Sequence, residues 1–159
     1  MDGSFHLFDG TPHIPKQDFT KPVNSPSGGG GLTSTTQDYF KFAQMLCNKG
    51  ELDGTRIIGP RTLAFMASNH LKLELLPYGI GLNRDHGRGF GLGFAVVIDP
   101  TQVGVLNSVG NYGWGGAAAT NFWVDPVEDI VGIIMTQLMD NMLPFQDEFR
   151  ALTYQALVD

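Results

Sequence analysis

The sequence predicts an α+β fold, in which helices pack on an antiparallel β-sheet of about four strands. Apolar residues recur at helical spacing in two segments, one near residue 40 and one at the C-terminal end. Between these segments lie short apolar stretches of strand character, joined by short links. Links of this length favour an antiparallel meander. The expected order is therefore helices, four sheet strands and one terminal helix.

Residues 1–31 are expected to form an extended Pro/Gly-rich strip without regular elements. They hold four of the nine prolines and end in Ser27 followed by four glycines. A segment of this length without helices or strands is unusual inside a complete domain. We therefore expect a strip at 1–31 that runs over something else, and a folded part at 32–159 that holds the helices, the meander and the terminal helix.

The first helix is predicted from Ser34 to Asn48. Its start fits a capping box, in which Ser34 is the N-cap and Gln37 reaches back to it. Residues at helical spacing form its apolar face: Tyr39, Phe42, Ala43 and Leu46. Two shorter elements follow. Asp53-Gly54 indicates a tight hairpin turn, and Pro60 suits the first position of a short helix that runs through Ser68.

Four strands are predicted, at residues 90–98, 103–109, 117–124 and 130–138. The fourth is apolar throughout, so we expect it at the centre of the sheet, covered on both faces. A four-stranded sheet also has exposed edges, which favour pairing with additional strands.

The terminal helix is predicted from Pro144 to Leu157. Asp147 and Glu148 lie in its first turn, where the helix dipole favours acidic side chains. One face of this helix is apolar and is expected to pack on the sheet; it consists of Phe145, Phe149, Leu152 and Ala156.

Composition and charge argue against several classes of partner. The formal net charge is −6 and no run is rich in Lys or Arg, whereas nucleic-acid binding relies on clustered cations. No apolar run reaches the ~18 residues of a membrane span. The first four residues lack the basic and apolar regions of a signal peptide. The sequence does not distinguish a bacterial cytoplasmic from a periplasmic location.

No metal and no cofactor are predicted. The four histidines are scattered without metal-ligand spacing, and the single Cys47 is expected to be a buried structural thiol. Residues 87–91 resemble half a dinucleotide-binding fingerprint, but they lead into a predicted strand and not into a helix.

Two glycine-rich places are the candidates for function. Gly28 to Gly31 precede the first helix, and the alternative interpretation there is a flexible connector. Gly115-Gly116 follow Trp114 and open a predicted strand, where paired glycines allow a ligand or another backbone to approach closely. They also leave a peptide N–H free to point into a cleft, as acyl-transfer enzymes require. The structural alternative is a bulge beside a core tryptophan.

Several runs of the chain occur in a familiar order. They are Ser27 to Thr35, Asp38 to Leu46, Gly54 to Ile58, Phe90 to Phe94, Trp114 to Pro126 and Gly132 to Gln137. Together they resemble the serine β-lactamase and penicillin-binding-protein-like hydrolases, most closely the class C-type enzymes and the carboxylesterases of the same fold. The resemblance covers nearly all of the chain from Gly28 onward. It implies the C-terminal portion of a β-lactamase/transpeptidase-like fold.

The resemblance also assigns roles. Trp114-Gly115-Gly116 corresponds to the third motif of the family, in its esterase-like form. Ala117 would then be the second N–H donor of the oxyanion hole, and Gly29 and Gly30 would line the opposite wall of the cleft. Tyr112 belongs with these substrate-contacting residues. Because an indole cannot supply the positive charge of the lysine that Trp114 replaces, recognition of a β-lactam carboxylate is less expected.

The other two family motifs are absent, since no Ser-x-x-Lys, Tyr-x-Asn or Ser-x-Asn occurs in the 159 residues. We therefore expect the C-terminal fragment of a serine hydrolase that acts on small ester, amide or β-lactam substrates, inactive by itself because it lacks the nucleophile. Its expected partners are the missing N-terminal half or a second copy bound at a sheet edge. The alternative is a non-catalytic binding or assembly module of the same fold.

Overall fold

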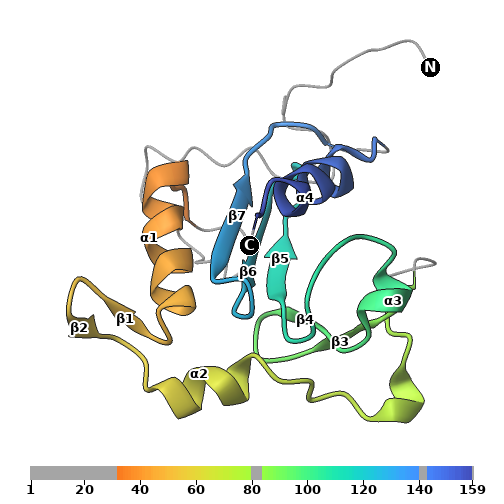
Figure 1. The fold of residues 1–159 in the computed structure, drawn as a ribbon, viewed down its shortest axis with the longest axis horizontal. Helices are drawn as coiled ribbons and strands as arrows, with labels where there is room; N and C mark the ends of the chain where they lie inside the picture. Colours follow the sequence, from red (N-terminus) through yellow and green to blue (C-terminus); the bar gives the residue numbers. More distant parts are fainter. Residues whose placement is uncertain (1–31, 80–83, 140–142, 159) are drawn as a thin grey trace, which may run out of the picture.

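A computed structural model describes residues 32–79, 84–139 and 143–158 of the chain. Five antiparallel strands form the main sheet in the order β3-β4-β5-β6-β7. Helix α1 covers one face of this sheet and α4 lies on the other (Figure 1). The predicted α+β class is therefore confirmed, with five strands in the sheet in place of four. The strip at 1–31, with Gly29 and Gly30, lies outside the described residues.

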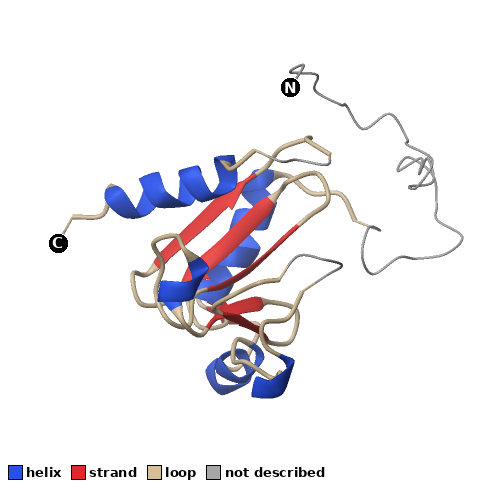
Figure 2. Cartoon of the chain, turned by 90° about the vertical axis from the view of Figure 1, so that its right-hand side faces the viewer, coloured by secondary structure: helices blue, strands red, loops and turns tan. Residues whose placement is uncertain are grey.

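Figure 2 shows the helices and strands of the described chain. In chain order they are α1 (Thr36–Cys47), β1 (Glu51–Leu52), β2 (Thr55–Arg56), α2 (Pro60–Met66), the 3-10 helix η1 (Leu73–Leu75), β3 (Arg88–Phe90), β4 (Ala95–Val97), α3 (Pro100–Val103), β5 (Tyr112–Gly115), β6 (Asn121–Asp125), β7 (Ile130–Ile134) and α4 (Phe145–Gln155).

The start of α1 differs by one residue from the prediction. Thr35, and not Ser34, is the N-cap, because its Oγ1 accepts a hydrogen bond from the Asp38 N–H at 3.1 Å. The Thr35 hydroxyl also donates to the Asp38 carboxylate at 3.1 Å. The residue that reaches back to the N-cap is therefore Asp38, through its carboxylate, and not Gln37 as predicted.

The hairpin at Asp53-Gly54 and the helix that begins at Pro60 are confirmed. Strands β1 and β2 pair antiparallel on either side of the turn. Asp53 and Gly54 both have positive φ, 48° and 75°, which is the backbone that favours Asp-Gly in two-residue hairpin loops. Local turn chemistry therefore decided both elements.

The strand predicted at 103–109 is wrong. The Asp99 carboxylate caps a short helix, α3, by accepting from the Thr101 N–H at 3.0 Å. Gly104, at φ 78°, ends this helix. The chain then runs without strand structure until Tyr112, where β5 begins. The apolar side chains that suggested a strand lie at the surface instead, since Leu106 and Val109 are 54% and 60% exposed.

The strand predicted at 90–98 is in fact a hairpin. The Gly91 N–H donates to the Phe94 carbonyl at 2.8 Å, and Gly93 has φ 95°. The backbone therefore turns between β3 and β4, which pair antiparallel. The strand predicted at 117–124 starts later, at Asn121, because residues 116–120 form a turn.

The strand predicted as central lies at the edge of the described sheet. β7 pairs with β6 on one side and has no strand partner on the other within the described ranges. Its apolar character has another cause: α1 and α4 both contact it, one from each face. An edge strand covered by helices on both faces is as apolar as a central one.

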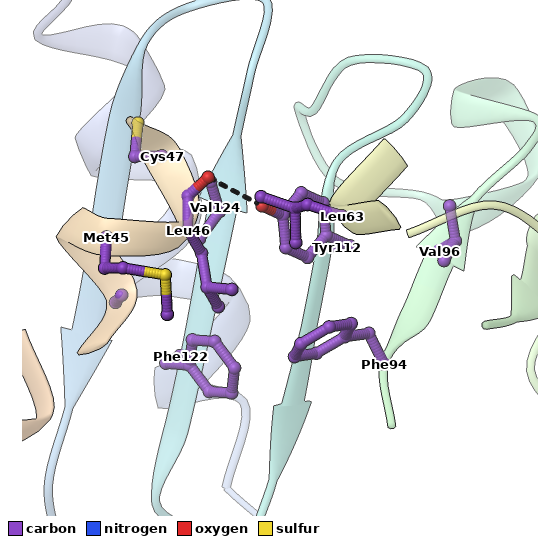
Figure 3. Packing of buried hydrophobic residues seen from close by; sticks show 10 residues of the cluster. Met45, Leu46, Cys47, Leu63, Phe94, Val96, Tyr112, Phe122 and Val124 are labelled. Carbon is purple, nitrogen blue, oxygen red and sulfur yellow. Dashed lines mark hydrogen bonds between the residues drawn. The ribbon is translucent and has the colours of Figure 1, made fainter. Parts of the chain in front are cut away.

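The main core lies between α1 and the facing side of the sheet (Figure 3). Leu46 from α1 packs with Tyr112, Phe122 and Val124, and the Tyr112 hydroxyl donates to the Leu46 carbonyl at 3.2 Å. Cys47 belongs to this core at 6% exposure, which confirms the buried thiol. Because this packing holds β5 and β6 against α1, it fixes the position of the glycine-rich end of β5.

The terminal helix is confirmed, but its predicted packing face is partly wrong. Leu152 is 65% exposed, whereas Arg150 is the buried residue of α4. The Arg150 guanidinium lies 4.4 Å from the centroid of the Trp123 ring, and Phe149 packs edge-to-face on the same indole. A cation stacked on an aromatic face therefore takes the place that the apolar pattern assigned to leucine.

Candidate active site at the end of strand β5

The C-terminal end of β5 has an open edge. On β5, β4 pairs with Tyr112 and Gly113 alone, so that no strand of the described ranges lies beside Trp114 and Gly115 on that side. The Gly116 N–H donates to the Thr120 carbonyl at 2.9 Å, toward β6. Since peptide groups alternate in direction along a strand, the N–H and C=O of Gly115 point to the open edge.

The turn after Gly116 is a three-residue hairpin loop. The Ala119 N–H donates to the Gly116 carbonyl at 3.0 Å, and Ala119 takes a left-handed conformation with φ 58°. This combination is typical of a three-residue β-hairpin connection. Ala117 occupies the second position of the turn and is exposed. Its N–H has no hydrogen-bond acceptor among the residues that the structure describes.

The loop is anchored through its carbonyl groups. The Ala118 carbonyl accepts from the Leu138 N–H at 3.2 Å and from the Thr136 hydroxyl at 2.5 Å. The Ala119 carbonyl accepts from the Gln146 side-chain amide at 2.6 Å. Three donors therefore hold the two carbonyls, while no described residue accepts a hydrogen bond from the Ala117 N–H.

Two hollows at this end of the sheet are both lined by Trp114. One, of about 360 Å³, lies beside the start of α1 and is lined by Thr35, Tyr39, Gly116 and Thr120 among others. The other, of about 200 Å³, lies on the α4 side. The indole lines both, is 40% exposed, and packs edge-to-face on Phe90 with ring centroids 4.9 Å apart. Trp114 therefore forms a fixed apolar wall.

The glycines at positions 113, 115 and 116 differ in how much room a side chain would have. A Cβ at Gly113 would lie 2.0 Å from the Phe122 carbonyl oxygen, so only glycine fits there. At Gly116 the nearest atom is the Thr120 hydroxyl, at 2.5 Å, which can rotate away. At Gly115 the nearest atom is 3.2 Å away, on Asn121. The structural requirement for glycine is therefore strongest at Gly113, which precedes the predicted motif.

Four of the predicted site residues lie together here: Trp114, Gly115, Gly116 and Ala117. Tyr112 does not join them. It is 4% exposed and hydrogen-bonded to the Leu46 carbonyl, so that it belongs to the core and lines neither hollow.

Beneath α4 lies a buried polar cluster that sequence reasoning missed. The Tyr154 hydroxyl donates to the Asp125 carboxylate at 2.5 Å, the Asn111 amide donates to the Tyr154 hydroxyl at 2.7 Å, and Arg150 donates to the Asn111 side-chain oxygen at 3.4 Å. Burial opposes the charge on Asp125, but hydrogen bonds from Tyr154, Ser108, Val127 and Glu128 together lower its pKa. No local sequence signal marks this cluster, because its members are up to 43 residues apart.

Arg150 connects this cluster to the α4-side hollow, whose lining also includes Arg88, Asp85 and Asp147. Burial lowers the pKa of Arg150 to about 10, and the charge of Arg88 acts in the same direction. The group nevertheless remains a cation at neutral pH. The hollow on this side is therefore polar and charged, in contrast to the more apolar hollow beside α1.

The Cys47 thiol is not activated as a nucleophile. Burial raises the pKa of the Cys47 thiol to about 11, and the Asp129 carboxylate beside it acts in the same direction. No cluster of His, Cys, Asp and Glu that could hold a metal ion occurs among the described residues. Within the same ranges, no helix has the length and hydropathy of a membrane span.

Known proteins are similar to this chain in sequence or in fold. Protein Rv1367c of Mycobacterium tuberculosis (strain ATCC 25618 / H37Rv) is 33% identical over 136 residues, which are 83% of this chain and 32% of that protein. The chain therefore spans about a third of the length of the curated relatives that it matches.

Two solved structures show the same fold at low identity. EstCE1, described as a hydrolase with promiscuous acyltransferase activity, matches with a TM-score of 0.71 and 22% identity, over 97% of this chain and 39% of that chain. A mutant of simvastatin synthase (LovD) from Aspergillus terreus matches with a TM-score of 0.64 and 20% identity, over 79% of this chain and 34% of that chain.

The family model described as Beta-lactamase matches residues 5–156, which is nearly the whole chain. Together with the shared fold, this match confirms the resemblance found in the sequence. The chain belongs to the beta-lactamase family and has the fold of its penicillin-binding-protein-like serine hydrolases.

Proposed function

We propose that this chain forms one wall of a serine acyl-transfer site and supplies one N–H donor of its oxyanion hole. The observation that carries the proposal is the N–H of Ala117, for which the described residues offer no acceptor. It sits beside the open edge of β5, in a loop whose Ala118 and Ala119 carbonyls are already bonded. An oxyanion hole requires donors of this kind, fixed in direction before the reaction begins.

The anchoring supports the proposal because it lowers the reorganisation needed during catalysis. Thr136, Leu138 and Gln146 hold the Ala118 and Ala119 carbonyls, so that the loop cannot turn a carbonyl toward the cleft without breaking these bonds. Loss of one oxyanion donor typically lowers kcat by about 10²–10³-fold.

We propose small esters as the substrates, in preference to β-lactams. Trp114 presents an apolar face where the β-lactam-binding members of the family have a lysine. Two solved structures of the same fold support acyl transfer by their descriptions. One is a hydrolase with promiscuous acyltransferase activity, and the other is a simvastatin synthase. Trp114, Gly115 and Gly116 would contact the acyl group. Gly29 and Gly30 remain proposed for the opposite wall.

The nucleophilic serine would come from outside this chain, since no Ser-x-x-Lys occurs in it. The first test is to incubate the 159-residue protein with p-nitrophenyl butyrate and with nitrocefin. We expect no burst, no turnover and no acyl-serine adduct by mass spectrometry. Turnover with an adduct on a serine of this chain would show that the nucleophile is present after all.

The second test supplies a polypeptide that carries Ser-x-x-Lys and Tyr-x-Asn, taken from the part of a family member that this chain does not match. Esterase activity of the mixture would support the proposal. In the active mixture, Ala117→Pro removes only the N–H, at a turn position where proline is common. We expect kcat to fall by about 10²–10³-fold, whereas Ala117→Ser, which keeps the N–H, stays close to the parent.

A non-catalytic binding or assembly module of the same fold is the alternative. It is favoured by the outer edge of β7, with which no strand of the described part of the chain pairs. A mixture that forms a stable complex but shows no esterase activity and no serine adduct would support this alternative over catalysis. Equal activity of Ala117→Pro and Ala117→Ser would remove the assigned role of the Ala117 N–H.

A further inference from the structure

Arg150 is a buried cation with few partners. It is 8% exposed, and no carboxylate of the described residues forms an ion pair with it. Its guanidinium makes one hydrogen bond within the described ranges, from Nη1 to the Asn111 side-chain oxygen at 3.4 Å. An arginine has five N–H donors, so Nε and Nη2 have no acceptor in this part of the chain. Unpaired donors on a buried cation are costly, and an anion would satisfy them.

The two free nitrogens of Arg150 reach open space. Neither belongs to the fully buried unpaired polar atoms of the described residues, which are Asn107 Oδ1 and Trp123 Nε1. The accessible space next to Arg150 is the hollow of about 200 Å³ on the α4 side, which this side chain lines. The Trp123 indole lies 4.4 Å from the guanidinium carbon. Stacking on this ring holds the plane of the guanidinium, so its free donors keep a fixed direction.

Small residues form the floor of the hollow. Gly113 pairs with Trp123 across β5 and β6, and with Ala95 across β4 and β5. Paired residues share a face of the sheet, and Trp123 contacts Arg150 of α4, so Gly113 and Ala95 lie on the α4 face. Gly115, two residues along β5, lies on the same face. All three residues line the hollow. Because none has a side chain longer than a methyl group, the space next to Arg150 stays open.

A second cation lines the same hollow. Arg88 of β3 donates from Nη1 to the Asp85 carboxylate at 2.9 Å, and no described residue accepts from its Nε or Nη2. The charge of Arg88 is, after burial, the next cause that lowers the pKa of Arg150. The two guanidinium groups therefore repel each other across a small space. An anion between them would replace this repulsion by two attractions.

Two carboxylates in the lining limit the charge of the ligand. The Asp85 carboxylate already accepts from Arg88 and, at 3.3 Å, from the Tyr78 hydroxyl. Asp147 is exposed, so water screens its charge more than that of the buried Arg150. Both carboxylates would repel a phosphate dianion more strongly than a monoanion. The planar fork of a guanidinium matches the two oxygens of a carboxylate.

We propose that the α4-side hollow binds a small monocarboxylate, whose two oxygens accept from the free Nε and Nη2 of Arg150 while Arg88 supplies the second cation. The short aliphatic part would lie on Ala95 and against Trp114. A hollow of about 200 Å³ admits a carboxylate of a few carbon atoms, such as butyrate. Binding there does not depend on the acyl-transfer chemistry, so either proposal can fail without the other.

The test is a titration of the ¹⁵N-labelled 159-residue protein with sodium butyrate, followed by NMR at pH 7 and constant ionic strength. We expect saturable shifts of the Arg150 Nε–H signal and of the Gly113 and Gly115 amides, with a Kd in the millimolar range. Butyramide has the same shape without the charge and should give no saturable shift. Butyrate shifts that do not saturate by about 100 mM, or an equal response to butyramide, would overturn the proposal.

Variants separate this site from general attraction to cations. Arg150→Lys keeps the charge but loses the fork, and we expect about tenfold weaker binding. Arg88→Met should also weaken binding, whereas Arg56→Met removes a comparable arginine, paired with Glu51 on β2, and should leave it unchanged. Asp147→Asn removes a repelling charge and should tighten binding. These three keep the test valid if Arg150→Lys does not fold. Equal affinity of Arg88→Met and Arg56→Met, or weaker binding by Asp147→Asn, would overturn the assignment.

Discussion

Gly132 is the residue whose substitution should reveal how tightly the sheet packs under α4. A Cβ built at Gly132 would lie 2.1 Å from Cζ2 of Trp123 and 2.3 Å from Cε2 and Cη2. Carbon atoms pack at about 3.5–4.0 Å, so the indole would have to move by roughly 1.4 Å. We therefore expect Gly132→Ala to destabilise the chain although it adds only one methyl group.

The indole has little freedom to move. Trp123 is 1% exposed, the Arg150 guanidinium lies 4.4 Å from its centroid, and Phe149 packs edge-to-face on the same ring. Displacing the ring therefore displaces α4. Overpacking of this kind typically costs about 1–3 kcal/mol. For a chain of this length we expect a fall in Tm of roughly 2–12 °C.

The assay is urea denaturation followed by circular dichroism, with two comparisons. Gly115→Ala serves as the control, because its Cβ would be 3.2 Å from the nearest atom and a small shift would accommodate it. In a Trp123→Leu background the clash is absent, so Gly132→Ala should cost less there, and the coupling measures the contact. The reasoning is refuted if Gly132→Ala changes the free energy of unfolding by less than about 0.5 kcal/mol.

Two further predictions concern titratable groups. Hydrogen bonds hold the pKa of Asp125 below its ordinary value, so its carboxylate stabilises the fold above pH ~4 and this contribution is lost as the pH falls through the folded-state pKa. In urea titrations, Asp125→Asn should therefore lower the free energy of unfolding by about 2 kcal/mol at pH 7. The free energy of unfolding should also decline less steeply between about pH 5 and pH 3 in this variant than in the parent. Identical pH dependence in the two proteins would show that the carboxylate does not contribute. Burial raises the pKa of the Cys47 thiol to about 11. The folded protein should therefore react with Ellman's reagent at pH 8 at least tenfold more slowly than the urea-unfolded protein. Equal rates would show that the thiol is accessible in the folded protein.

Elements defined by local chemistry were predicted well. The apolar face of α1, the Asp53-Gly54 hairpin and Pro60 at the start of α2 each depend on residues within one or two turns of each other. The resemblance also placed Trp114, Gly115, Gly116 and Ala117 at one end of one strand, where the structure has them. In both cases the information lies in contiguous residues.

Errors arose where distant residues decide the structure. Residues 103–109 have strand-like composition, but Asp99 caps α3, and the partner of β4 is the segment that begins at Tyr112. β7 looked central because helices cover both of its faces, a property that apolar composition alone cannot separate from burial between strands. The N-cap is the exception, because its shift from Ser34 to Thr35 has a local cause: Asp38 lies three residues beyond Thr35 and is hydrogen-bonded to it.

The sequence by itself determined the family, the α+β class and the positions of the third motif, because each of these is carried by short runs of neighbouring residues. Only the tertiary structure decided what surrounds that motif. Thr136 binds the Ala118 carbonyl, 18 residues before it in the chain, and Gln146 binds the Ala119 carbonyl, 27 residues before it. Arg150 and Asp125 are both hydrogen-bonded to Asn111 beneath α4. Among the described residues, no strand pairs with the outer edge of β7. Contacts between residues so far apart depend on how the helices and strands pack, and no local pattern encodes that packing.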